Sequence, residues 1–230
     1  MYKNNKIYEN VIKQIKKEII NGTLKKGQKF PPEREMAERL GVSRTSIREA
    51  IRALEVIGLV ESRQGAGNYI KESFENSLIE PLSIMFLLQQ SNPMEVAELR
   101  RILEVETVVL AVDRIEKSEI IDLEGIVEKM KTSTDEWINV ALDKEFHHVI
   151  AKASKNFLFI NISLVLSQLI DEFIKGIRKE ILSKEENREK LIKIHETVIE
   201  AMKLKNKDMA REAMEEHFLI IDENIFCNVK

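Results

Sequence analysis

Residues 33–70, with the sequence EREMAERLGVSRTSIREAIRALEVIGLVESRQGAGNYI, decide the fold of the first part of the chain. Apolar residues recur with helical spacing on both sides of the turn Gly41-Val42-Ser43, and Ser43 can cap the helix that follows. The segment Gln64-Gly65-Ala66-Gly67 then separates two short runs typical of strands. This order predicts a winged helix-turn-helix. The predicted elements are helices over 6–21, over 33–40 and from the turn to about 57, and strands over 59–63 and 68–70.

The second helix of a helix-turn-helix lies in the major groove of DNA and turns its first residues toward the base edges. Here that helix begins Arg44-Thr45-Ser46-Ile47-Arg48. Arginine matches guanine with two hydrogen bonds, and threonine can bond a base or pack against the thymine methyl group. Scattered arginines more often form a solvated charged face, but the order of turn, helix and glycine wing favours DNA binding. The polar face of this helix holds Arg44, Thr45, Arg48 and Arg52.

Charge is divided unevenly along the 230 residues. Residues 1–71 hold 15 Lys and Arg against 8 Glu, a formal charge of +7, whereas the remainder carries −10 and the whole chain −3. A basic first segment is the pattern expected of a polyanion binder. No apolar run approaches the ~20 residues that cross a bilayer, and the single cysteine, Cys227, cannot form an internal disulfide. We therefore expect a reduced cytoplasmic protein with no membrane partner.

Beyond the wing the chain has the pattern of helices, with no useful strand alternation and no repeat. The expected fold class is mainly α: the winged helix-turn-helix with its two-stranded wing, then an antiparallel all-α bundle of about seven helices. We expect a DNA-binding domain at 1–71, a linker at 72–77 and an all-helical domain at 78–230. The predicted bundle helices span 78–90, 93–115, 117–132, 134–153, 156–182, 186–204 and 207–226.

All four histidines of the chain lie in the predicted bundle. Asp143 and His147 are four residues apart in one helix and so share a face, and His195 and His217 lie on two later helices. One carboxylate and three imidazoles can form a divalent-metal site with room for water or a ligand. Taken singly, each histidine is more simply a hydrogen-bonded core residue, so spacing alone leaves both interpretations open.

Arg100 is a second candidate, in the segment Glu98-Leu99-Arg100-Arg101-Ile102-Leu103-Glu104. An arginine that faces a bundle interior needs an anionic partner, and a carboxylate ligand would serve. A surface ion pair with Glu104, four residues on, is the simpler interpretation from spacing alone.

At these residues the first part of the chain resembles the GntR superfamily of bacterial regulators, in its FadR subfamily. The resemblance runs from Gly22-Thr23-Leu24-Lys25-Lys26-Gly27 through the helix-turn-helix to Gly65-Ala66-Gly67. Pro32 departs from the usual serine, and Ala66 stands where many members have a basic wing residue, which puts one wing contact in doubt. The resemblance implies operator DNA contacts at Arg34, Ser43, Arg44, Thr45, Ser46, Arg48, Gly65 and Gly67.

The rest of the chain resembles the helical effector domain of the same subfamily, called FCD. The markers are Arg100-x3-Glu104, Asp143-x2-Phe146-His147, Ala153-Ser154-Lys155-Asn156, His195 and Met214-x2-His217. The resemblance implies a divalent metal, zinc before nickel, manganese or iron, and an organic-acid effector held at Arg100. Lactate, pyruvate and sugar-acid sensors are the similar members, and an acyl-CoA effector is not expected. The implied metal ligands are Asp143, His147, His195 and His217.

Together these features predict a homodimeric transcriptional regulator, expected to be a repressor, on a near-palindromic double-stranded operator. A small carboxylate bound at the metal site would control its DNA binding. Two alternatives stay open at this point. The metal could be purely structural, or absent, in a domain that only dimerises; or the Asp and His group could serve a metal-dependent hydrolase, although the helix-turn-helix would then have no role. We do not expect the protein to be an enzyme.

Overall fold

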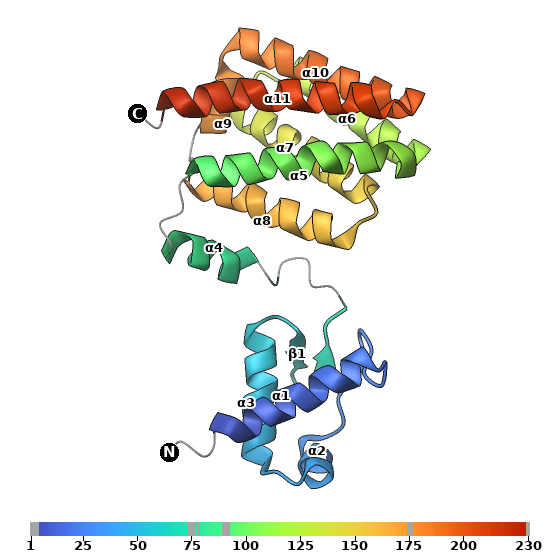
Figure 1. The fold of residues 1–230 in the computed structure, drawn as a ribbon, viewed down its shortest axis with the longest axis vertical. Helices are drawn as coiled ribbons and strands as arrows, with labels where there is room; N and C mark the ends of the chain where they lie inside the picture. Colours follow the sequence, from blue (N-terminus) through green and yellow to red (C-terminus); the bar gives the residue numbers. More distant parts are fainter. Residues whose placement is uncertain (1–4, 73–76, 78, 89–92, 174–176, 229–230) are drawn as a thin grey trace. The chain divides into compact units, whose positions relative to one another are not determined.

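The computed structural model describes residues 5–72, 77, 79–88, 93–173 and 177–228 (Figure 1). The chain divides into two compact units, one ending at Pro81 and the other beginning at Leu82. Residues 73–76 of the predicted linker lie outside the described residues, so the boundaries at 72 and 77 stay predictions. Within the described residues no helix is both long and apolar enough to span a membrane.

The N-terminal unit is a winged helix-turn-helix. Helices α2 and α3 are separated by Gly41, whose φ of +64° suits the left-handed cap that glycine adopts without strain. The strands form an antiparallel pair in which Val60 faces Ile70 and Arg63 faces Gly67. The elements are α1 Asn5–Ile20, α2 Glu33–Leu40, α3 Arg44–Val56, β1 Val60–Arg63 and β2 Gly67–Ile70.

One core holds this unit together, and the loop before α2 adds to the wing. The loop extends the strand pairing, because Phe30 N donates to Asn68 O at 2.8 Å and Ile70 N donates to Gln28 O at 2.9 Å. Burial of the apolar faces of α1 and α3 fixes how the helices pack. The core includes Val11, Ile15, Leu24, Phe30, Met36, Ile47, Ile51, Leu54, Val60 and Ile70.

The second unit is a bundle of helices. Helix α5 contacts α7, α8, α10 and α11, and α6 packs on α7 and α10. Figure 1 shows α5 between α11 and α8. The range 156–182, predicted as one helix, holds α8 and α9, and residues 174–176 between them lie outside the described residues. The helices after the wing are α4 Ile79–Leu88, α5 Pro93–Arg114, α6 Lys117–Thr132, α7 Glu136–Ala153, α8 Phe157–Phe173, α9 Ile177–Ser183, α10 Glu185–Leu204 and α11 Lys207–Asn228.

Apolar packing and caps set the register of the helices that carry the predicted ligands. Phe146 of α7, Val198 of α10 and Phe218 of α11 are each at most 1% exposed and belong to one core. Each lies within three residues of a predicted ligand along the chain. Asp135 begins α7 by accepting hydrogen bonds from the backbone N–H groups of residues 137 and 138. The core therefore orients the polar residues beside it.

Candidate functional site

The predicted operator contacts of α2 and α3 are mostly accessible. Arg34, Arg44, Thr45 and Arg48 are exposed, as contacts to bases or phosphates require. Arg48 donates a hydrogen bond of 3.2 Å to Glu33 Oε2, which links the start of α3 to the start of α2. These side chains form the polar face of α3 and the adjacent end of α2.

Two predicted contacts, Ser43 and Ser46, have a structural role in the same turn. Ser43 Oγ accepts a hydrogen bond of 3.1 Å from Ser46 N and lies 2.9 Å from Ser46 Oγ, so Ser43 is the N-cap of α3. Ser43 is exposed, whereas Ser46 is only 4% exposed. The Ser46 hydroxyl is therefore buried, unlike the exposed residues Arg44, Thr45 and Arg48 that were predicted to contact DNA with it.

The predicted wing glycines, Gly65 and Gly67, are exposed and have φ angles of +72° and +104°. Other residues rarely adopt these angles. At Gly67 a Cβ atom would also lie 3.1 Å from the side chain of Lys29. The turn therefore needs glycine for its shape, whatever it contacts.

The four predicted metal ligands meet in the interior of the bundle. Asp143 and His147 come from α7, His195 from α10 and His217 from α11. One ligand atom from each lies within 4.8 Å of every other, and all four residues are buried. Sequence spacing placed two of these residues on one face, and helix packing brings the other two to it.

The geometry of this group fits a divalent metal ion. The Nε2 atoms of His147, His195 and His217 each lie 3.7 Å from Asp143 Oδ1, and those of His147 and His217 are 3.3 Å apart. Ligands about 2.0–2.2 Å from a tetrahedral ion are separated by about 3.3–3.6 Å. His195 is 2% exposed, and its ring nitrogens have no hydrogen-bond partner among the described residues. Buried polar atoms in proteins usually have a partner, and a metal ion bound to His195 would supply one.

The imidazoles of His195 and His217 are held in the form that binds metal. Burial lowers the pKa of His195 well below its usual value, and the neighbouring His217 lowers it further. Burial also lowers the pKa of His217 to about 4, although the carboxylate of Asp143 partly opposes this. Both rings are therefore neutral near pH 7, and metal coordination requires neutral imidazole.

Glu104 connects the four candidate metal ligands to Arg100. Its Oε2 lies 2.5 Å from His147 Nδ1, and its Oε1 accepts a hydrogen bond of 2.5 Å from Arg100 Nε. Arg100 is 2% exposed and Glu104 6%. Burial alone would raise the pKa of Glu104, but Arg100 and His147 hold it well below its usual range. The ion pair expected from spacing is present, and it is buried rather than on the surface.

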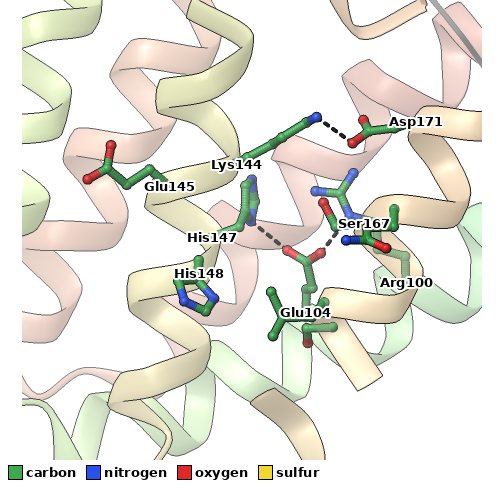
Figure 2. Close-up of a pocket in the computed structure, with 11 residues that line it drawn as sticks. Arg100, Glu104, Lys144, Glu145, His147, His148, Ser167 and Asp171 are labelled. Atoms are coloured by element: carbon green, nitrogen blue, oxygen red, sulfur yellow. Dashed lines mark hydrogen bonds and ion pairs between the residues drawn. The ribbon is translucent and has the colours of Figure 1, made fainter. Parts of the chain in front are cut away.

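A cavity of about 430 Å³ opens beside this chain of contacts. Its walls come from α5, α7 and α8, and Figure 2 shows Glu104 between Arg100 and His147, with the Lys144–Asp171 ion pair nearby. Sequence reasoning named Arg100 and His147 of this lining but missed the residues from α8, because their place in the cavity depends on how α7 and α8 pack. The lining residues are Arg100, Glu104, Lys144, Glu145, His147, His148, Ser163, Leu164, Ser167, Gln168 and Asp171.

Two family models match the chain, one for each unit. Residues 7–70 match the bacterial regulatory proteins of the gntR family. Residues 95–219 match the FCD domain. The second range contains Arg100, Glu104, all four candidate ligands and the whole lining of the cavity.

Curated and solved proteins give the same result over nearly the whole chain. The HTH-type transcriptional regulator LutR of Bacillus subtilis (strain 168) is 31% identical over 207 residues, which cover 89% of this chain and 94% of that protein. The Uxu operon regulator of Haemophilus influenzae is 29% identical over 226 residues, 96% of this chain and 83% of the relative. The solved Streptococcus agalactiae GntR is 27% identical with a TM-score of 0.72, covering 94% and 99% of the two chains. The chain therefore belongs to the gntR family of bacterial transcriptional regulators, with an FCD domain after its DNA-binding domain.

Proposed function

We propose that this regulator acts as a homodimeric repressor whose affinity for a near-palindromic operator is controlled by a small carboxylate bound in the FCD domain. The observation that supports the proposal is a continuous series of contacts from the cavity to the candidate metal ligands: Arg100 contacts Glu104, and Glu104 contacts His147. Repression is the simpler outcome of operator binding, because a dimer seated over a promoter excludes the polymerase without any further contact.

In this proposal α3 reads the operator. Two subunits present α3 to successive major grooves about one helical turn apart. Arg44 and Arg48 supply base contacts, and Arg34, with the backbone of the wing glycines, contacts phosphates, which adds affinity that salt weakens.

We expect Arg48→Ala to lower operator affinity by about 1–3 kcal/mol, because one arginine–guanine contact is of that size. Fluorescence anisotropy with labelled operator at matched salt measures the change. Lys203→Ala removes the same charge from the FCD domain and should leave the affinity unchanged. Because Arg48 is exposed, its variant should unfold like the parent; equal operator affinity in the two variants would refute the role of Arg48.

The FCD domain would hold a divalent metal, zinc before nickel, manganese or iron, through Asp143, His147, His195 and His217. When bound, the metal supplies positive charge and open coordination positions for a carboxylate. Arg100 lies in the lining of the adjacent cavity and can orient the same carboxylate through its planar fork of donors. An acid that binds one arrangement of the dimer more tightly than another would shift its affinity for DNA.

A thermal-shift screen of small carboxylates on metal-loaded protein tests the sensing role, because a ligand stabilises the state that binds it. We expect an acid that raises the melting temperature of the parent and also changes operator affinity. Arg100→Lys keeps the buried charge but loses the two-pronged geometry, so it should weaken that acid by about tenfold, or 1.4 kcal/mol. Metal binding with no response to any acid would support the alternative of a structural metal in a dimerisation domain.

A further inference from the structure

A second, much smaller cavity lies beside His195. Its walls come from α6, α7, α9 and α10, and no residue lines both this cavity and the one beside Arg100. Its volume is about 10 Å³. One buried water needs about 10–15 Å³ of such space. The cavity is therefore the size of a single water and too small for an organic ligand.

Three buried polar atoms of this lining have no hydrogen-bond partner among the described residues. They are Asn139 Oδ1, Arg188 Nε and His195 Nδ1. Buried polar atoms in proteins are nearly always bonded, so three of them around so small a space indicate a shared occupant. The Nδ1 atom of His217 also has no partner in the described part of the chain, but His217 does not line this cavity.

The two neighbours of His195 in the lining are held by the turn that precedes α7. Arg188 Nη1 donates a hydrogen bond of 3.1 Å to Ser133 O, and Asn139 Nδ2 donates one of 3.5 Å to the same oxygen. Each side chain is thus fixed through one atom. The Nε–H group of Arg188 and the Oδ1 atom of Asn139 are left for another partner.

The donors and acceptors of the lining match one water molecule. His195 Nε2 lies 3.7 Å from Asp143 Oδ1, and a neutral ring that binds a metal through Nε2 carries its proton on Nδ1. The lining therefore offers two donors, from His195 and Arg188, and one acceptor, from Asn139. A water can accept the first two bonds and donate the third, and about three bonds are usual for a buried water. An anion would be repelled by Asn139 Oδ1, and a cation by the charge of Arg188.

We propose that Asn139 and Arg188 hold one buried water that accepts a hydrogen bond from His195 Nδ1 and so orients His195 toward the metal. This inference rests on the metal site of the proposed function. A ligating histidine almost always donates its other N–H to a carboxylate, a carbonyl or a water, which fixes its tautomer and the direction of its ring. Glu104 is that partner for His147, with Oε2 at 2.5 Å from Nδ1. The water has the same role for His195, and Asn139 and Arg188 are positioning residues.

Two substitutions of Asn139 test the role of the water. Leucine and aspartate are close to asparagine in size, and both lose the Nδ2 donor to Ser133 O, but only aspartate keeps an oxygen that can accept from the water. We expect Asn139→Leu to weaken zinc binding by the full chain about tenfold, at the low end of the effects of such partners. Asn139→Asp should bind zinc nearly as tightly as the parent. Competition with a chromophoric chelator measures both, and equal weakening in the two variants would overturn the role of the water.

Arg188→Met tests the other contact of the water. It removes the Nε donor and should also weaken zinc binding about tenfold. Lys193→Met is the control, because it removes the same charge from an exposed position of α10. We expect the control to bind zinc like the parent. An equal zinc affinity of the two methionine variants contradicts the inference.

A crystal structure of the zinc-loaded full chain tests the water directly. We expect one ordered water within hydrogen-bonding distance of Asn139 Oδ1, Arg188 Nε and His195 Nδ1. A parent structure in which these atoms surround no water overturns the inference, whether or not the variants fold. If the parent binds zinc but Asn139→Leu binds it equally well, only this inference fails. If the parent binds no metal, the metal site of the proposed function fails as well.

Discussion

Glu104→Gln should lower the free energy of unfolding of the FCD domain by about 3–5 kcal/mol, the usual result of breaking a buried ion pair on one side. Arg100 is 2% exposed, and its guanidinium would lose the carboxylate that now accepts its hydrogen bond at 2.5 Å. Asp143 offsets this only in part, because its charge acts on Arg100 more weakly than the charge of Glu104 does. Urea unfolding followed by circular dichroism measures the change.

The same variant should weaken metal binding by about 10- to 100-fold, since carboxylates that hold a ligating histidine have effects of that size. Competition with a chromophoric chelator measures it independently of stability. The control is Glu106→Gln on the same helix, whose carboxylate pairs with Arg211 and is 50% exposed. Exposed pairs contribute at most about 1 kcal/mol. If both variants unfold at the same urea concentration, the buried Arg100–Glu104 pair contributes no more to the free energy of unfolding than an exposed pair does.

Metal removal should have the second large effect. A ligand at 100 times its dissociation constant stabilises the folded state by about 2.7 kcal/mol, which in a domain of this size corresponds to about 5–11 °C in melting temperature. Protein stripped with a chelator should therefore melt lower by this amount, and restoring zinc should return it. Elemental analysis of protein prepared without a histidine tag should find close to one metal ion per chain.

Two histidine variants test whether this shift comes from the proposed site. His217→Ala removes a candidate ligand that is fully buried, and the metal-dependent shift should disappear. His148→Ala removes a neighbouring histidine that lines the cavity but is outside the ligand group, and the shift should persist. The opposite pattern, or loss of the shift in both variants, would show that the metal binds elsewhere.

The winged helix-turn-helix was predictable because its signals are local. The helix-turn-helix follows from one turn, in which Gly41 takes a positive φ and Ser43 caps the next helix. The pairing of the Gln28–Phe30 loop with β2 was missed, since it joins segments about 40 residues apart. The helix predicted over 6–21 is observed as α1, Asn5–Ile20, but its apolar side chains are not buried up to its end, because Ile20 is 75% exposed.

The candidate site shows the same division between local and distant information. Four-residue spacing predicts that Asp143 and His147 share a face and that Arg100 can pair with Glu104. Spacing cannot show that this pair is buried, nor that Glu104 also reaches His147 on another helix. Those facts depend on the register of α5 against α7, which apolar packing determines.

The positions of the candidate ligands along the chain would make degradation of the protein depend on the metal. His147 and His217 are separated by 70 residues, so a metal ion shared by them would tether the last helix, α11, to the middle of the bundle as a reversible cross-link. Unlike a disulfide, this cross-link would need no oxidant, and it would stabilise the folded chain by binding it rather than by restricting the unfolded chain. When metal is scarce, α11 would open more often and become accessible to proteases. The lifetime of the regulator in the cell would then follow the metal supply, independently of any effector.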